Sequence, residues 1–568
     1  MNERRTERGP GPLAGIGARP GVVKWCVAIP RTLAPYWLDL LQRSGVPMTL
    51  LGDEGARGTV GFCAGLDLAR DRVAHDHLRA LWRAGVPLVL DARAFASLTG
   101  RDAETVRVER VSGDGRLFAD ANAVRLPMRL AIPGGARFGW VSPQGRAAIA
   151  IDESGAAPLI GLPLPEVSAI EAATPRLVRF PLSRGRHATE IVSACDHAGV
   201  RRLVENALAV AAHAVGLPFV RFAPAPGDHL GAFAVRIDAD SYDPGATERT
   251  LDALARGAVR ATWFLDVARH ARLGGATAVP KLLAAGHEVQ SHHWRHYTFR
   301  SRARSRANLA RSFEVLRAWG VEATAAAAPF GSWNVGLDAA MRELGIAWSS
   351  EFSRCHDDIP GAGPHSGAAD GGWLTDPPWQ VPTHPVCPAL MLDAGLSPDE
   401  VAECYARLIR SRLLRGEPAV IYGHPIDDIE RVPGLFAALD ETLGELERVA
   451  RIGAVWQPTL GELCAFHRAR RHQAIACRVG EDSVEGEVRG PAGLWIDLPD
   501  GSRVRTGPGR FVVRLDRNCL TRVPASSGNE VGTNGRAGSV EPSGLVLARL
   551  RMGISRWKRE VLSRTGER

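Results

Sequence analysis

Apolar runs of strand length alternate with helix-type patterns along the first hundred residues. Each apolar run ends near a turn residue, and the segments between runs repeat their apolar positions every three or four residues. Such βα alternation predicts a small parallel sheet. The strands are expected at 23–30, 47–51, 58–65 and 86–91, with helices at 34–44 and 75–84.

The pattern changes after this sheet, and no catalytic group is evident in it. Short β-type runs and turn residues follow from 104 to about 180, for example at 146–154, and a long helix is expected at 200–215. The α/β part resembles glutamine-amidotransferase-like or flavodoxin-like domains. However, the strand ending at Asp91 is not followed by a Gly-flanked cysteine that could act as a nucleophile. We assign 22–220 to an N-terminal α/β domain with a β-rich extension and no predicted role.

Longer βα units begin at Gly231. Repeated units of this length imply a barrel or a doubly wound sheet, and we place this domain at 228–470. The strands are FAVRIDAD, ATWFLDV and HEVQSH, and the helices are expected at 247–256, 278–285 and 308–319.

The two ends of the chain have a different character. Residues 1–21 are polar and rich in Gly, Pro and Arg, and we expect them to be disordered. Four short strands predict a small β-domain at 471–522. The remainder, 523–568, reads as a linker and a basic amphipathic tail, which we expect to contact a membrane surface or another subunit.

Composition narrows the class of protein. With 45% apolar and 23% charged residues, the 568-residue chain is typical of globular proteins. The sequence shows neither a signal-peptide core nor an apolar run of bilayer length, and its nine cysteines are scattered. We therefore expect a cytoplasmic protein. If it associates with membranes, we expect the contact to be made by its tail. A net charge of +8 is modest for this length, and the sequence shows no phosphate loop and no nucleic-acid module.

Candidate catalytic groups stand at the ends of three predicted strands. Asp238 and Asp240 lie on one side of their strand, and His292 and His296, four apart, would share one face of a helical turn. Two imidazoles and one carboxylate suit a divalent ion such as zinc, our first choice, or cobalt, nickel or manganese. The other carboxylate could act as general base, and His424 as general acid.

These groups appear in the order found in a known family. From Gly231 to Pro425 the chain resembles the polysaccharide deacetylase domain (NodB-like, carbohydrate esterase family four), through RIDAD, RATWFLDV, GHEVQSHHWRH and VIYGHP. Its first motif is similar to that of the undecaprenyl-phosphate aminoarabinose deformylases. The resemblance implies a distorted (β/α) barrel of the NodB type, with Asp238 as base, Asp240, His292 and His296 as metal ligands and His424 as acid.

Two further motifs match less closely. AAPFGSWN resembles the third family motif and suggests Pro329, Phe330 and Gly331 at the substrate and oxyanion side, but Ala328 stands where the family has an arginine. This leaves open what tunes Asp238. For the fourth motif, Trp379 and His384 are candidates to contact substrate or support His424.

Three functional hypotheses follow. The first is a metal-dependent hydrolase that removes an acetyl or formyl group from an acylated amino sugar or a glycan or glycolipid precursor. The second is a catalytically inactive deacetylase fold that binds carbohydrate or serves as a scaffold in glycan biosynthesis, which the missing arginine permits. The third makes the tail an anchor that brings the site to a lipid-linked substrate.

Overall fold

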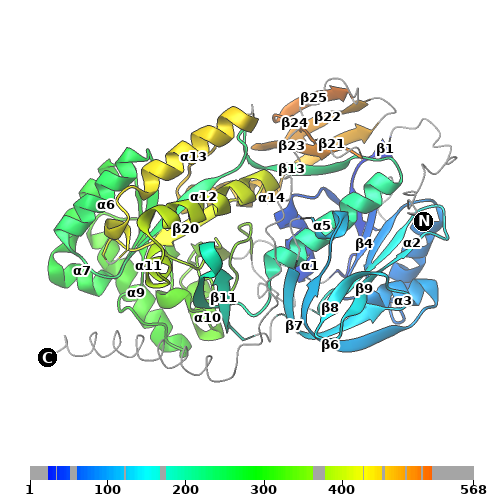
Figure 1. Cartoon of the computed structure of the whole chain (residues 1–568), viewed down its shortest axis with the longest axis horizontal. Helices are drawn as coiled ribbons and strands as arrows, with labels where there is room; N and C mark the ends of the chain where they lie inside the picture. Colours follow the sequence, from blue (N-terminus) through cyan, green and yellow to red (C-terminus); the bar gives the residue numbers. More distant parts are fainter. Residues whose placement is uncertain are drawn as a thin grey trace, which may run out of the picture. The chain divides into compact units, whose positions relative to one another are not determined.

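The structure is a computed structural model of the whole chain (Figure 1). The expectations for residues 1–21 and for the linker and tail at 523–568 lie outside the residues it describes. It describes residues 23–514, with the exception of 34, 52–59, 120–122, 167–169, 171–173, 363–377, 427, 451–454, 480–482 and 500–502.

The N-terminal region forms a mixed sheet of nine described strands in the order β3-β2-β4-β5-β10-β9-β8-β6-β7. Its first five strands are parallel, in the 2-1-3-4-5 order of doubly wound folds. They are β2 (Val27–Ile29), β3 (Met48–Leu50), β4 (Val60–Cys63), β5 (Leu88–Asp91) and β10 (Leu159–Leu162). The helices here are α1 (Pro35–Ser44), α2 (Arg72–Arg83), α3 (Ala92–Thr99) and α5 (His197–Ala214). The predicted βα order of this region is therefore confirmed.

The predicted β-rich extension continues this same sheet rather than forming a separate layer. Its antiparallel strands are β6 (Ala103–Ser112), β7 (Ala123–Pro133), β8 (Phe138–Ser142) and β9 (Arg146–Asp152). A hairpin of β11 (Arg176–Pro181) and β12 (His187–Val192) follows before α5.

The central region contains a parallel sheet that curls into a half-barrel. Its described strands lie in the order β19-β18-β17-β16-β15-β14-β20, so the α/β half-barrel architecture is confirmed. They are β14 (Phe233–Ala239), β15 (Ala261–Leu265), β16 (Glu288–Ser291), β17 (Ala325–Ala326), β18 (Trp348–Ser349), β19 (Trp379–Gln380) and β20 (Ala419–Gly423).

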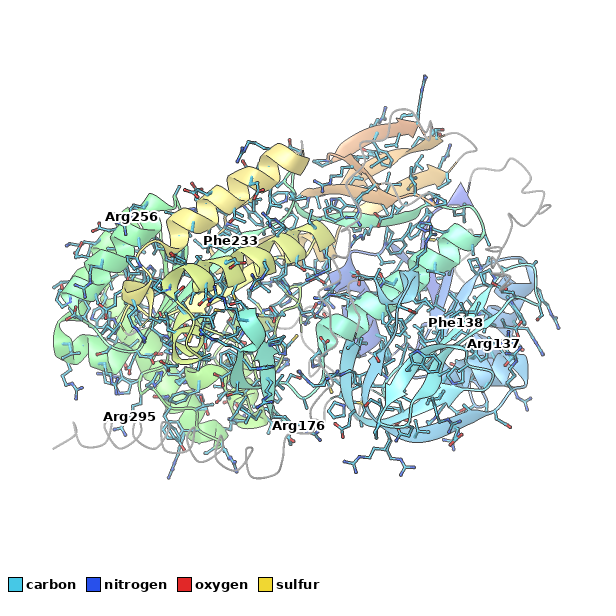
Figure 2. All side chains as sticks on the ribbon, viewed as in Figure 1. Arg137, Phe138, Arg176, Phe233, Arg256 and Arg295 are labelled. Carbon is cyan, nitrogen blue, oxygen red and sulfur yellow. The ribbon has the colours of Figure 1, made fainter. Side chains whose placement is uncertain are left out.

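Helices cover the outside of this sheet, seen in green and yellow in Figure 1. Apolar residues of β14 to β16 pack against them, and Phe233, labelled in Figure 2, is fully buried in this core. The helices begin at capping residues such as Asp243 before α6, whose side chain accepts a hydrogen bond from Ala246 N. They are α6 (Pro244–Arg256), α7 (Val267–Leu273), α8 (Val279–Ala284), α9 (Arg302–Ala318), α10 (Val335–Glu343), α11 (Pro388–Asp393), α12 (Pro398–Arg415) and α13 (Leu435–Ala450). By contrast, α14 (Leu460–Arg471) packs on the other face of the sheet, in an apolar cluster with Ala232, Ala234 and Phe264.

The C-terminal β region completes two sheets that begin elsewhere in the chain. One sheet pairs β21 (Ala474–Val479), β22 (Ser483–Arg489) and β25 (Gly509–Arg514) with β1 (Val23–Lys24). The other pairs β23 (Ala492–Asp497) and β24 (Arg503–Thr506) with β13 (Phe219–Pro226). Within the described ranges, no helix has the length and apolar character needed to cross a membrane.

Candidate metal centre and active site

The carboxyl ends of three half-barrel strands supply the candidate catalytic groups. Asp238 and Asp240 stand at the end of β14, His292 and His296 follow β16, and His424 follows β20. Since β14 pairs with β20 on one side and with β15 on the other, and β15 with β16, parallel pairing brings these ends to one edge. Barrel active sites are built at this edge.

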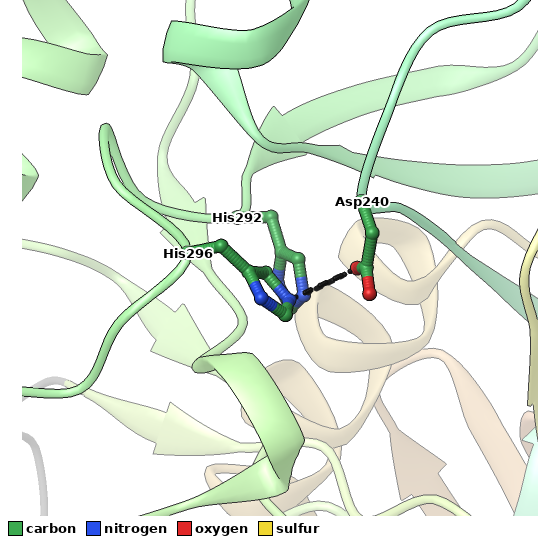
Figure 3. Close-up of side chains that lie close together, drawn as sticks. All are labelled: Asp240, His292 and His296. Carbon is green, nitrogen blue, oxygen red and sulfur yellow. Dashed lines mark ion pairs between the residues drawn. The ribbon is translucent and has the colours of Figure 1, made fainter. Parts of the chain in front are cut away.

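Asp240, His292 and His296 converge on one point (Figure 3). Asp240 Oδ1 lies 3.3 Å from His292 Nε2 and 3.1 Å from His296 Nε2. Ligand atoms at bond lengths of about 2.0 to 2.1 Å around a tetrahedral ion are separated by about 3.3 Å, so these spacings fit a zinc-sized ion. Burial would raise the pKa of Asp240, but the two imidazoles hold it well below its ordinary value.

Among the described residues, two of these ligand atoms have no hydrogen-bond partner outside the cluster. Asp240 Oδ1 and His296 Nε2 are buried, and neither makes a well-formed hydrogen bond within the described part of the chain. Buried polar atoms are nearly always satisfied, so two that face each other at 3.1 Å indicate a place for a cation. The residues present therefore fit a divalent metal.

The backbone carbonyl of Ala327, directly after β17, fixes the ring of His292. Its Nδ1 lies 2.7 Å from the carbonyl oxygen of Ala327, so Nδ1–H donates there and Nε2 keeps its lone pair for the metal. The helical turn predicted for the histidine pair is wrong, because the described chain from 292 to 298 is a loop in which His293 has φ +70°. This loop still brings the rings of His292 and His296 to 5.0 Å, and His293 points instead to the carbonyl of Tyr297.

Asp238 is held by an arginine on its own strand. Arg236 Nε lies 2.6 Å from Asp238 Oδ1 and Arg236 Nη2 lies 2.7 Å from Oδ2. Burial opposes ionisation of Asp238, but the Arg236 guanidinium, together with His292 and His424, more than offsets this, so the pKa of Asp238 is lowered. The carboxylate is thus ionised at neutral pH, as a general base must be.

His424 is oriented by Asp428. Its Nδ1 lies 2.8 Å from Asp428 Oδ2, and its backbone N–H donates to Asp428 Oδ1 at 2.6 Å. Burial alone would lower the pKa of His424, but Asp428 and a contact from Cys387 raise it well above its ordinary value. The imidazole is therefore protonated at neutral pH and suited to be an acid. Asp428 was not among the predicted site residues, although a carboxylate four residues after the candidate acid His424 was a visible signal.

The predicted third motif lies beside the metal cluster. Pro329, Phe330 and Gly331 form a short 3₁₀ turn after β17, and Phe330 has φ +59°. The ring of Phe330 meets that of His296 edge to face at 4.8 Å. Any side chain at Gly331 would strike the ring of Phe352, so this turn requires glycine. The structure thus brings Phe330 to the site.

Trp379 and His384 make their contacts away from Asp240, His292 and His296. Trp379 is 3% exposed and packs with Trp348 in the core of the half-barrel. The Nδ1 of His384 lies 3.0 Å from Asp357 Oδ2, and its ring contacts Phe180 of β11. The structure therefore brings neither residue to the metal cluster.

One comparison identifies the region that carries this geometry. Residues 233–348 match the family described as polysaccharide deacetylase. This segment is similar to the polysaccharide deacetylase domain. It contains Asp238, Asp240 and the two candidate metal ligands His292 and His296, and it ends before His424. None of the curated proteins matches the chain.

Solved structures resemble part of the chain at low identity. A Mycobacterium smegmatis protein assigned to the polysaccharide deacetylases is 21% identical, over 44% of this chain and 96% of its own, with a TM-score of 0.34. A Clostridium thermocellum family 4 acetyl xylan esterase with cobalt is 17% identical, over 41% and 90%, with a TM-score of 0.28. A Bacillus anthracis family 4 pseudoenzyme is 16% identical, over 41% and 65%, with a TM-score of 0.28.

Proposed function

We propose that the protein is a metal-dependent hydrolase that removes an N-acyl group, acetyl or formyl, from an amino sugar or a glycan precursor. One observation carries the proposal. The buried, otherwise unpartnered Asp240 Oδ1 and His296 Nε2 converge with His292 Nε2 in a deacetylase domain, with an ionised carboxylate and a protonated imidazole nearby.

Each side chain has a role in amide hydrolysis. A divalent ion held by Asp240, His292 and His296 would polarise the amide carbonyl and lower the pKa of water. Asp238 accepts a proton from the attacking water, whose oxygen bonds to the carbonyl carbon. As the C–N bond breaks, the imidazolium of His424 donates its proton to the amine nitrogen. Phe330 contacts the His296 ring, and its backbone N–H is our candidate donor for stabilising the oxyanion.

The charge states of Asp238 and His424 suit this division of work. The pKa of the base is lowered and that of the acid is raised, so both are in the required form over the same neutral pH range. His424 also lies near enough to Asp240 for its charge to help lower the pKa of that carboxylate.

Acyl release from defined amino sugars tests the proposal. Protein reconstituted with zinc or cobalt would be incubated with N-acetyl and N-formyl amino sugars and with di-N-acetylchitobiose, and the released acetate or formate measured. Metal-dependent release of acid with an equal amount of free amine supports the hydrolase. Binding of these sugars without release, in protein that holds its metal, would favour the inactive carbohydrate-binding alternative.

A further inference from the structure

Arg236 lies inside the half-barrel, where the catalytic function requires no cation of its own. Alternate residues of a strand share a face, so Arg236 and Asp238 of β14 project to the same side, away from Val235 and Ile237, which pack against the helices. The Arg236 side chain is fully buried. A buried charge is costly unless it is paired and hydrogen-bonded, so its contacts should reveal its role.

All three guanidinium nitrogens of Arg236 are engaged. Nε and Nη2 bind the two oxygens of Asp238 at 2.6 and 2.7 Å, and Nη1 donates to the carbonyl and hydroxyl oxygens of Ser350. The rings of Phe264 and Tyr422 lie 5.3 and 5.6 Å from the guanidinium carbon. The group is therefore fixed in plane and in position, and it fixes the Asp238 carboxylate in turn.

The paired contact with Arg236 leaves the Asp238 carboxylate able to accept a proton. Each carboxylate oxygen accepts one hydrogen bond from Arg236 and retains a further lone pair. The carboxylate can then accept a proton from water in a single orientation beside the metal ligands. A lysine at 236 would keep the charge but could not make the paired contact.

Position 328 offers no alternative source of this contact. The side chain of Ala328 is buried in an apolar cluster with Leu309, Leu337 and Met341, on the side of α9 and α10. Its backbone N–H points to Glu351 at 3.3 Å. A guanidinium at 328 would have to enter this apolar cluster, so in this fold the cation that faces Asp238 comes from β14.

We propose that Arg236 is the positioning residue of Asp238 and that it does the work left open by the alanine at 328. The inference rests on the proposed function, because it takes Asp238 as the general base. It adds that the base and its orienting cation are a single unit on one strand, two residues apart.

A double-mutant cycle tests this coupling. Arg236→Lys, Asp238→Asn and the double variant would be compared with wild type, and Arg354→Lys would serve as control because Arg354 is also buried and also paired with an aspartate, at 3.4 Å. Turnover and KM would be measured on whichever acylated amino sugar wild type hydrolyses. Metal content and the urea midpoint of unfolding would be measured for every variant.

The proposal predicts a kcat effect that depends on Asp238. Arg236→Lys should lower kcat by about 100-fold, the scale expected for a misplaced catalytic group, with KM and metal content nearly unchanged. In the Asp238→Asn background the same substitution should change kcat by less than about threefold. Equal loss in both backgrounds, or an effect of Arg236→Lys no larger than that of Arg354→Lys, would overturn the proposal.

The unfolding midpoints separate this proposal from the proposed function. If wild type hydrolyses none of the sugars although it holds metal, the hydrolase proposal fails. The midpoints still report whether Arg236 and Asp238 are coupled. The midpoint shift of the double variant should be smaller than the sum of the single shifts, and additive shifts would contradict the pairing.

Discussion

The N-terminal sheet and the half-barrel each place an aspartate at the carboxyl end of a parallel strand. Asp91 ends β5, and Asp240 follows β14. The oxygens of Asp91 accept hydrogen bonds from the backbone N–H groups of Gly65 at 2.6 Å and of Arg93 and Ala94 at 2.9 Å. By contrast, Oδ1 of Asp240 is buried without such a donor and faces two imidazoles.

The contrast shows that strand-end position alone does not make a site. Asp91 caps the start of α3 and also accepts a hydrogen bond from the turn after β4. Its carboxylate oxygens are therefore occupied by structural hydrogen bonds. Asp240 is left for a ligand. Substitutions at the two positions should therefore have opposite consequences for stability and function.

The largest effect is expected at Asp240. Asp240→Ala should abolish metal binding and lower acyl release on the order of a thousandfold, since metal polarisation contributes several kcal/mol. The metal-free protein should lose stability only as far as its imidazoles are protonated, because their contact with Asp240 is ionic and Oδ1 accepts no backbone N–H within the described residues. Release of acetate or formate measures the loss of activity, and unfolding by urea measures the change in stability. Asp243→Ala is a matched control, since Asp243 only caps α6. Wild-type turnover in Asp240→Ala would contradict the assignment.

A smaller effect is expected at Asp428. Asp428→Asn removes the carboxylate that raises the pKa of His424, so the imidazolium loses its proton at lower pH. We expect kcat to fall by about 100-fold, within the range for general acid catalysis, and the basic limb of the pH–rate profile to move to lower pH. Metal content should be unchanged. An unmoved basic limb would show that His424 is not the acid, and Asp393→Asn, at a surface position, serves as control.

The smallest effect on activity is expected at Asp91. Asp91→Ala removes the cap of α3 and leaves Gly65 N–H without its acceptor, which should cost about 1 to 2 kcal/mol of stability. Metal content and acyl release should match wild type at temperatures well below unfolding. Urea unfolding measures the loss of stability, and elemental analysis measures the metal content. Loss of metal in Asp91→Ala would mean that the N-terminal sheet contributes to the centre.

The strand-end groups were predictable because strand pattern and motif order agree. Asp238 lies near the end of the apolar strand β14, Asp240 directly follows it, and His292 directly follows β16. The contact between Arg236 and Asp238 could also have been predicted, because residues two apart on a strand share a face. It was not predicted because a buried arginine is unexpected in an apolar strand.

Other features could not be read from local pattern. The loop that carries His292 and His296 mimics helical spacing, and only its hydrogen bonds to Ala327 and Tyr297 show how it folds. Trp379 lies on a two-residue strand, too short for alternation to reveal which way its ring points. The pairing of β1 with β21 joins residues more than 400 positions apart, a contact that no local rule anticipates.

The metal content of the purified protein, measured by elemental analysis beside His292→Ala, tests the central claim most directly. The convergence of Asp240, His292 and His296 predicts about one divalent ion per chain in wild type, or on reconstitution with zinc or cobalt, and its loss in the variant. A wild type that neither holds nor takes up a metal, or a variant that retains it in full, would contradict the assignment of this centre.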